Sequence, residues 1–186
     1  DFTDVISGRC PLARAAAPHP ELVGLHLLTA PVNPSAEPDQ AGVTALLKQA
    51  KAQFDYVLID SPAGVGDGFR LAVCGADRAI VVSTSDASSL RDAQHTVGEL
   101  TVPTIHLVVN RVQPKLLRRL RSTIDDAMDT AGLPLLGVVP EDPGVMLSAN
   151  QGIPIVLNTT GKGAALAYLN IAKRIAGQRV PIMKLR

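Results

Sequence analysis

One segment constrains the fold of this 186-residue chain more than any other: the run Phe54-Asp55-Tyr56-Val57-Leu58-Ile59-Asp60-Ser61-Pro62-Ala63-Gly64. Its unbroken apolar stretch predicts a strand, Phe54–Asp60, buried on both faces in a parallel sheet covered by helices. The strand ends in Asp60, and the carboxyl ends of strands in open α/β sheets form the rim where ligands bind. The run therefore predicts an α/β fold with a carboxylate at that rim. An aspartate that merely starts a turn explains the spacing equally well.

Short apolar stretches alternate with helical stretches along the rest of the chain. Strands are predicted at Leu25–Ala30, Arg78–Thr84, Thr104–Asn110 and Leu135–Pro140, and helices around Leu46 and Leu47, at Asp86–Leu100 and at Leu116–Thr130. This order is typical of βαβ units and a mainly parallel sheet, the three-layer α/β class. The length and the 46% apolar content fit a single domain spanning residues 1–186.

The charge pattern argues against nucleic-acid binding. The net charge is +1, which gives no general attraction to polyanions. A basic run at Arg111–Arg121 is followed by acids at Asp125–Asp129, and on a single helix such blocks are typical of a solvated, self-neutralising face. The four histidines form no ligand cluster, and the two cysteines are far apart, as expected for reduced thiols.

Several segments, taken in order, closely resemble the MinD family. They are Asp4–Cys10, Asp60–Gly64, Ala76–Val82, Ser88–Asp92, Val109–Arg111, Gly137–Asp142 and Asn150–Val156. No single motif is decisive, but the ordered set covers nearly the whole chain. MinD proteins are ATPases of the MinD/ParA deviant P-loop group that position the bacterial division septum. The resemblance therefore implies a P-loop NTPase-like fold that binds ATP and Mg²⁺.

The family's phosphate-binding loop is not found in the 186 residues. A loop of the form G-x-x-x-x-G-K-[ST] wraps phosphates with backbone amides and contributes a lysine and a hydroxyl. Gly161–Gly163 lacks the hydroxyl after its lysine, and a G-x-G-x-x-G match at Gly64–Gly68 would place Phe69 at the last glycine. Both stretches are therefore interpreted as turns or helix starts. Asp1 matches the middle of a MinD chain, and we interpret the sequence as a fragment without its first βαβ portion. The catalytic residues are expected in that portion, so the chain as given is expected to be inactive.

The resemblance implies roles for two groups of residues. Asp60 would hold Mg²⁺ through water, and Gly64 would donate its N–H to the γ-phosphate. Asn110, Arg111 and the loop Pro140-Glu141-Asp142 would hold the adenine. The residues themselves are compatible with this, because Asn can hydrogen-bond a base edge and Arg can stack on a purine. Both segments end predicted strands and should share a rim with Asp60, although either could be an ordinary turn.

A third group lies near the start of the Asp86–Leu100 helix, where Asp86 is a good N-cap. Ser89, Arg91 and Asp92 would form a dimer and regulator surface if the resemblance holds, or otherwise a solvated helix face. The implied partners are a second copy on ATP binding, the division-inhibitor and activator proteins of the Min system, and the membrane surface, with no nucleic acid. The implied location is cytoplasmic, peripheral to the inner face of the cell membrane.

Three alternatives to a septum-placing ATPase remain. Two lie within the same group of proteins: a flagellar-number regulator and a ParA-type DNA partitioner. The Asn150–Pro154 stretch favours MinD over both. The third is a non-catalytic interaction module that kept the partner-binding helix and lost the nucleotide site.

Overall fold

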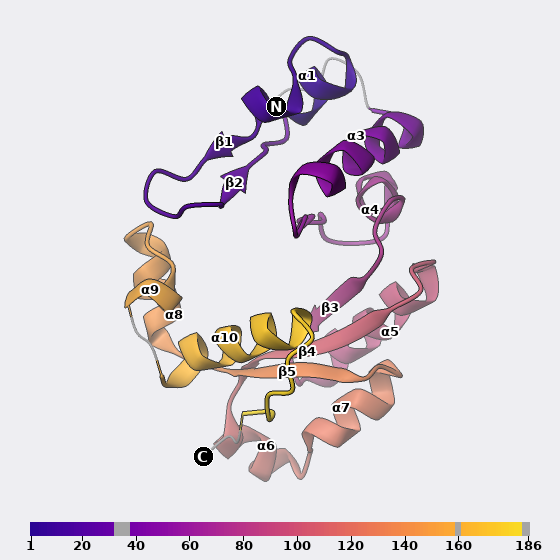
Figure 1. Ribbon diagram of the computed structural model, residues 1–186. Helices are drawn as coiled ribbons and strands as arrows, with labels where there is room; N and C mark the ends of the chain where they lie inside the picture. Colours follow the sequence, from indigo (N-terminus) through magenta and orange to yellow (C-terminus); the bar gives the residue numbers. More distant parts are fainter. Residues whose placement is uncertain (32–37, 159–160, 184–186) are drawn as a thin grey trace. The chain divides into compact units, whose positions relative to one another are not determined.

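A parallel three-stranded sheet organises the second of two units into which the chain divides in the computed structural model (Figure 1). The structure describes residues 1–31, 38–158 and 161–183. The units are Asp1–Ala76 and Asp77–Arg186.

The described part of the first unit contains helices, one short strand pair and long irregular stretches. Its elements are α1 (Phe2–Ile6), α2 (Leu12–Ala15), β1 (Ala17–Pro18), β2 (His26–Leu27), α3 (Gln40–Gln53) and α4 (Asp67–Val73). The two short strands pair with each other in antiparallel orientation. Asp39 starts α3 by accepting a hydrogen bond from the Gly42 N–H at 2.7 Å, which satisfies one of the free donors of the first turn. Helix α3 then buries Leu46 and Ala50 against Val5 of α1 in a small apolar core.

The second unit contains the sheet and most of the remaining helices. Its elements are β3 (Ala79–Ser83), α5 (Ala87–Glu99), β4 (Ile105–Val112), α6 (Pro114–Leu120), α7 (Ile124–Ala131), β5 (Leu135–Pro140), α8 (Pro143–Asn150), α9 (Ile155–Asn158) and α10 (Gly163–Ile175). The strand order is β3-β4-β5, and both pairings are parallel. The predicted α/β class and parallel sheet are therefore confirmed.

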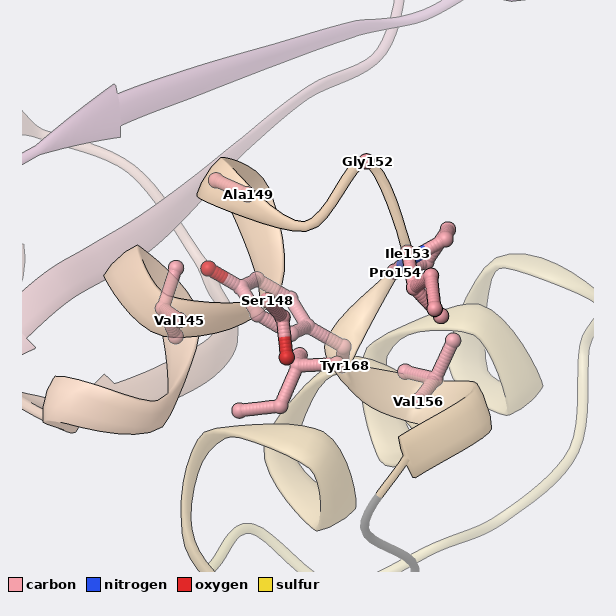
Figure 2. Close-up of a pocket in the computed structure, with 9 residues that line it drawn as sticks. Val145, Ser148, Ala149, Gly152, Ile153, Pro154, Val156 and Tyr168 are labelled. Atoms are coloured by element: carbon pink, nitrogen blue, oxygen red, sulfur yellow. The ribbon is translucent and has the colours of Figure 1, made fainter.

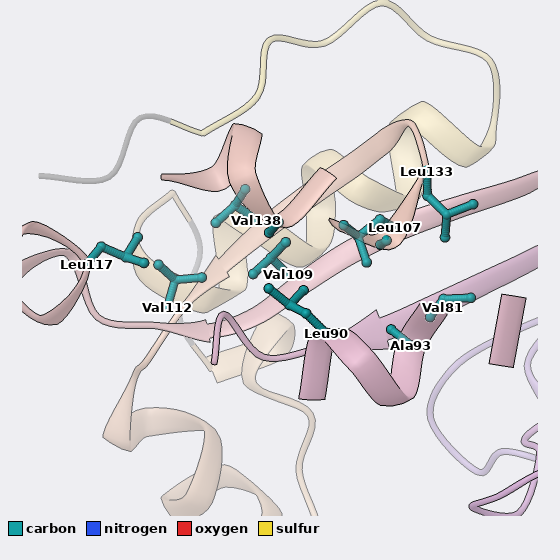
Figure 3. Packing of buried hydrophobic residues seen from close by; sticks show 11 residues of the cluster. Val81, Leu90, Ala93, Leu107, Val109, Val112, Leu117, Leu133 and Val138 are labelled. Carbon is teal, nitrogen blue, oxygen red and sulfur yellow. The ribbon is translucent and has the colours of Figure 1, made fainter. Parts of the chain in front are cut away.

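The sheet has a packed core on each face. On one face, Leu107 and Val109 of β4 share a core cluster with Leu90 of α5 (Figure 3), and Ala127 of α7 belongs to the same cluster. On the other face, Val108 of β4 joins a cluster with residues of β5, α9 and α10. The alternation of neighbouring β4 residues between the two clusters follows from the two-residue period of a strand. The result is the three-layer arrangement predicted from the sequence.

Helix α10 lies close to the sheet because β5 carries a glycine. A Cβ added at Gly137 would overlap the side chain of Ile171, so a larger residue would push the helix away. Ala164, Ala165 and Ala167 are buried along the same helix, and small side chains allow the same close approach.

No helix in the described part of the chain has the length and apolar character needed to cross a bilayer.

Three expected elements differ from the structure. Phe54–Asp60 is not a strand: it follows α3 as irregular chain, with Leu58 84% exposed. A strand forms only by bonding to a neighbour, and within the described residues no strand pairs with this segment. The strand predicted at Leu25–Ala30 shortens to β2. The helix predicted at Leu116–Thr130 is two helices, because Arg121 takes a left-handed conformation (φ 52°) that ends α6.

Candidate functional site

The carboxyl end of β4 carries a bulge at two of the predicted base-binding residues. Val109 pairs with Val138 and Val112 pairs with Pro140, so Asn110 and Arg111 together oppose the single residue Val139. Arg111 has φ 53°, a left-handed value that residues other than glycine seldom adopt. Bulges bend a strand and redirect its side chains, and they are common beside active sites. The bulge therefore sets the direction in which the Arg111 guanidinium leaves the sheet.

That guanidinium reaches the neighbouring strand end. Arg111 Nη2 donates to Glu141 Oε1 at 3.2 Å, and Gln113 Nε2 donates to Glu141 Oε2 at 2.6 Å. The backbone N–H of Glu141 donates to the Val112 carbonyl at 3.0 Å, which extends the contact of the two strand ends. The structure thus brings Asn110, Arg111 and the Pro140–Asp142 loop together, as the sequence predicted for this rim.

The same contacts set the charge state of the rim. The hydrogen bond from Gln113, followed by that from Arg111, lowers the pKa of Glu141 below its ordinary value. Both donors favour the ionised carboxylate, so Glu141 stays charged further into acid than a free glutamate. The carboxylate and guanidinium are both solvent-exposed, so their ion pair contributes little to the stability of the fold. Its main effect is to fix the directions of the Arg111 and Glu141 side chains at the rim.

Asp142 ties the rim loop to a distant helix. Its Oδ1 accepts from the Gly144 N–H at 2.9 Å and starts α8, while its Oδ2 accepts from the Ala164 N–H at 3.1 Å at the start of α10. Lys162 is the N-cap of α10 and Gly163 (φ 56°) is its first residue, so this glycine-lysine stretch is a helix start, as the sequence indicated, and not a phosphate loop. Both carboxylate oxygens of Asp142 are therefore engaged in holding backbone.

Asp60 and Gly64 belong to the first unit. Both are exposed in irregular chain, and Gly64 has φ 84°, which makes it a genuine glycine turn. The prediction that Asp60 ends a buried strand is wrong, for the reason given above. Its place relative to the β4 and β5 rim, and its contact with Mg²⁺ through water, stay predictions. Among the described residues no three His, Cys, Asp or Glu side chains cluster closely enough to hold a metal ion.

The predicted partner-binding residues lie on the first turns of α5. Asp86 is the N-cap, as predicted: its Oδ1 accepts from the Ser89 N–H at 3.0 Å and the Ser88 hydroxyl at 2.6 Å. These bonds, with one from Thr84, hold the pKa of Asp86 well below its usual range. Ser89 is half-buried, whereas Arg91 and Asp92 are exposed on the face opposite the core. They are accessible to a partner, and that role stays a prediction.

An apolar pocket of about 550 Å³ in the second unit was not predicted. Figure 2 shows Tyr168 of α10 beside Ser148 of α8, with Val145 on one side and Ile153 and Pro154 on the other. Helices α8 and α9 also carry exposed apolar side chains, namely Met146, Leu147 and Leu157. The sequence signal was the apolar Ile153–Leu157 stretch after Gly152, which only the fold of α8 and α9 turns into a concave surface. Apolar surface of this kind is typical of protein contacts.

The chain is similar to septum site-determining proteins over nearly its full length. It is 36% identical over 185 residues to the septum site-determining protein MinD of Synechocystis sp., which is 97% of this chain and 70% of that protein. It is 36% identical over 194 residues to the MinD of Bacillus subtilis, which is 100% of this chain and 71% of that protein. No family model matches the chain.

Solved structures give the same result. The MinC:MinD cell division protein complex of Aquifex aeolicus matches with a TM-score of 0.89 at 31% identity, over 99% of this chain and 75% of that one. MinD of Pyrococcus horikoshii complexed with Mg-ADP matches with a TM-score of 0.77 at 25% identity, over 92% and 71%. A ParA family ATPase of Chlorobium tepidum, at 20% identity and a TM-score of 0.74, shares the fold.

Proposed function

Because the chain belongs to the MinD family of septum site-determining proteins, in the MinD/ParA group of P-loop ATPases, we propose that it acts as an ATP-dependent switch in placing the division septum. The switch alternates between an ATP-bound dimer on the membrane and a released monomer. The observation that supports a nucleotide role in this chain is the joined rim of β4 and β5, where Asn110, Arg111 and Glu141 meet.

The rim suits the adenine end of ATP. The Asn110 amide can hydrogen-bond a base edge, and the exposed Arg111 guanidinium is planar and can stack on a purine. Glu141 holds that guanidinium in place, and Gln113 in turn holds Glu141. In this proposal Asp142 contributes through the backbone of its loop, because its carboxylate already binds two N–H groups.

The phosphate end depends on residues of the first unit. Gly64 would donate its N–H to the γ-phosphate, and Asp60 would hold Mg²⁺ through a water molecule. Magnesium neutralises the charge that develops on the transferring phosphoryl group, and catalysis of this kind is mostly positioning and electrostatic stabilisation. The phosphate-loop lysine and hydroxyl that this needs are not found in the 186 residues. We therefore expect the chain alone to bind ATP weakly and to show no ATPase activity.

The partners follow from the family and from the α5 surface. Arg91 and Asp92 would contact a second copy in the ATP-bound dimer or a Min-system regulator. A MinD of Aquifex aeolicus is solved in complex with MinC, which supports a partner of this type. In this proposal the protein is cytoplasmic and associates with the inner face of the cell membrane while it is dimeric.

A non-catalytic interaction module is the second candidate. One observation favours it: an open apolar pocket lies between α8, α9 and α10. In this alternative the α5 face and the pocket bind proteins, and the strand-end rim is only structural.

Nucleotide titration separates the two candidates. A fluorescent ATP analogue with Mg²⁺ is titrated into the chain as given and into a version preceded by a strand, phosphate loop and helix of the family. We expect tight binding only in the extended version, because each charge-assisted hydrogen bond lost costs about 1.5–3 kcal/mol, roughly tenfold or more in affinity. Tight binding by the chain alone would show that the phosphate site has been misplaced.

Variants of the extended version test the rim. Asn110→Ala should weaken binding about three- to tenfold through loss of a neutral hydrogen bond. Asp129→Ala, at an exposed position on α7, is the matched control and should bind normally. If the extended version does not bind the analogue at all, the interaction module is the better description of this chain.

A further inference from the structure

We propose that α6 forms a contact surface for anionic lipid headgroups. The surface, called here the α6 face, consists of Lys115, Leu116, Arg119, Leu120 and Arg121. It lies outside the nucleotide site and the α5 surface, and it requires no bound nucleotide. The proposal rests on the membrane association proposed above and assigns a contact in it to side chains within the second unit.

Helix α6 is held to the sheet by a single leucine. Leu117 is 8% exposed and belongs to the core beside Val109 and Val112 (Figure 3). Leu116 and Leu120, one turn apart on the same flank, are 42% and 61% exposed. Side chains four residues apart on a helix are neighbours, so these two leucines form one continuous apolar strip. Among the described residues of the second unit, neither core cluster includes Leu116 or Leu120.

Cations line the strip on its outer side. Lys115 and Arg119 lie opposite Leu117 on the helix and point away from the core, and both are exposed. Arg121 follows at the helix end and is exposed as well. Within the described part of the chain, none of these three cations pairs with a carboxylate. Arg118 is different, because its Nε turns back to the Pro114 carbonyl at 3.4 Å.

The acids that follow belong to another helix. Arg121 adopts a left-handed conformation and ends α6, and Thr123 begins α7. Asp126 closes the start of α7: its Oδ2 accepts from the Thr123 N–H at 2.7 Å, and its own N–H donates to the Thr123 hydroxyl at 3.1 Å. The sequence reading of one self-neutralising helix therefore fails, and α6 carries basic side chains and no acidic ones.

Leucines beside cations favour a lipid surface over nucleic acid. Interfacial helices insert apolar side chains at the boundary of headgroups and acyl chains while Lys and Arg attract anionic lipids. Binding of single-stranded nucleic acid uses aromatic side chains as stacking platforms, and α6 has no aromatic residue. Two leucines bury little area, so we expect weak binding by one copy, increased when two copies share a surface.

Vesicle co-sedimentation without nucleotide tests the proposal. The full 186-residue chain is mixed at low salt with vesicles of phosphatidylcholine alone or of phosphatidylcholine with phosphatidylglycerol. We expect binding only to the anionic vesicles. Lys115→Gln with Arg119→Gln should weaken it about 20- to 30-fold, since each cation near an anionic surface contributes about fivefold. Leu116→Ser with Leu120→Ser should weaken it about tenfold.

Matched pairs of substitutions make the test specific. Lys173→Gln with Arg179→Gln removes the same charge from exposed positions, and Leu147→Ser with Leu157→Ser removes the same apolar groups. Both control pairs should bind vesicles like the parent, and circular dichroism should show every variant folded. Equal losses in the control pairs would overturn the proposal, as would no binding to anionic vesicles. Binding to duplex DNA that needs Lys115 and Arg119 but not the leucines would also overturn it.

Discussion

Replacing Asp142 by alanine is expected to weaken the starts of two helices at once. The carboxylate caps α8 through the Gly144 N–H and holds α10 through the Ala164 N–H. Loss of an aspartate N-cap costs about 1 kcal/mol. Ala164 is 0% exposed, so its N–H has no access to water, and a buried unsatisfied donor costs about 1–3 kcal/mol. The free energy of unfolding should therefore fall by about 2–4 kcal/mol.

Urea unfolding followed by circular dichroism measures this change. The Tm of the variant should also fall by about 4–16 °C, because 1 kcal/mol corresponds to about 2–4 °C in a chain of this length. Asp142→Asn keeps one acceptor oxygen and should lose about half as much. Thr123→Ala is the control, because Thr123 accepts a single backbone N–H at the start of α7, from Asp126, and should cost about 1 kcal/mol.

Amide hydrogen exchange locates the effect. In Asp142→Ala the Gly144 and Ala164 amides should exchange faster, while amides of α7 should change only as much as global stability does. If Asp142→Ala costs no more than Thr123→Ala, or if the Ala164 amide keeps its protection, Asp142 does not connect the rim loop to α10.

Two further predictions concern the rim charge and the core. Gln113→Leu should raise the pKa of Glu141 toward its ordinary value, and NMR titration of the Glu141 carboxyl carbon measures this change. Because the pKa is lowered in the folded state, this contact stabilises the fold at neutral pH, and its contribution to stability is lost as the pH falls through the folded-state pKa. An unchanged titration would contradict the assigned hydrogen bond. Leu107→Ala should cost about 2–5 kcal/mol, because Leu107 is 0% exposed in the core, whereas Leu147→Ala at 63% exposure should change the unfolding free energy by less than about 0.5 kcal/mol. Similar costs for both in urea unfolding would contradict the core assignment.

Local patterns in the sequence predicted the second unit well. The strands near Arg78–Thr84, Thr104–Asn110 and Leu135–Pro140 were found within two residues, because each is a strand-length apolar run that has a neighbouring strand to pair with in the same unit. Asp86 was found as an N-cap because the bond to Ser89 spans only three residues. Such features depend on neighbours along the chain and can be read from it directly.

The errors lie where pairing between distant residues decides. Phe54–Asp60 has the composition of a buried strand, yet a strand needs the N–H and C=O groups of a neighbouring strand, and composition does not provide them. The break at Arg121 was missed because a left-handed arginine has no local signature, unlike a glycine or proline.

The candidate site divides in the same way. Asn110, Arg111 and Glu141 were predicted as base-binding residues from the family resemblance and from their positions at strand ends. The structure brings them to one rim, and their base-binding role stays a prediction. The bulge that aims Arg111, and the bond from Asp142 to a backbone N–H 22 residues away, exist only in the folded unit. The sequence alone determined which side chains are present at the rim. Tertiary structure decided their directions, because register and long-range hydrogen bonds form only when β4, β5 and α10 pack together.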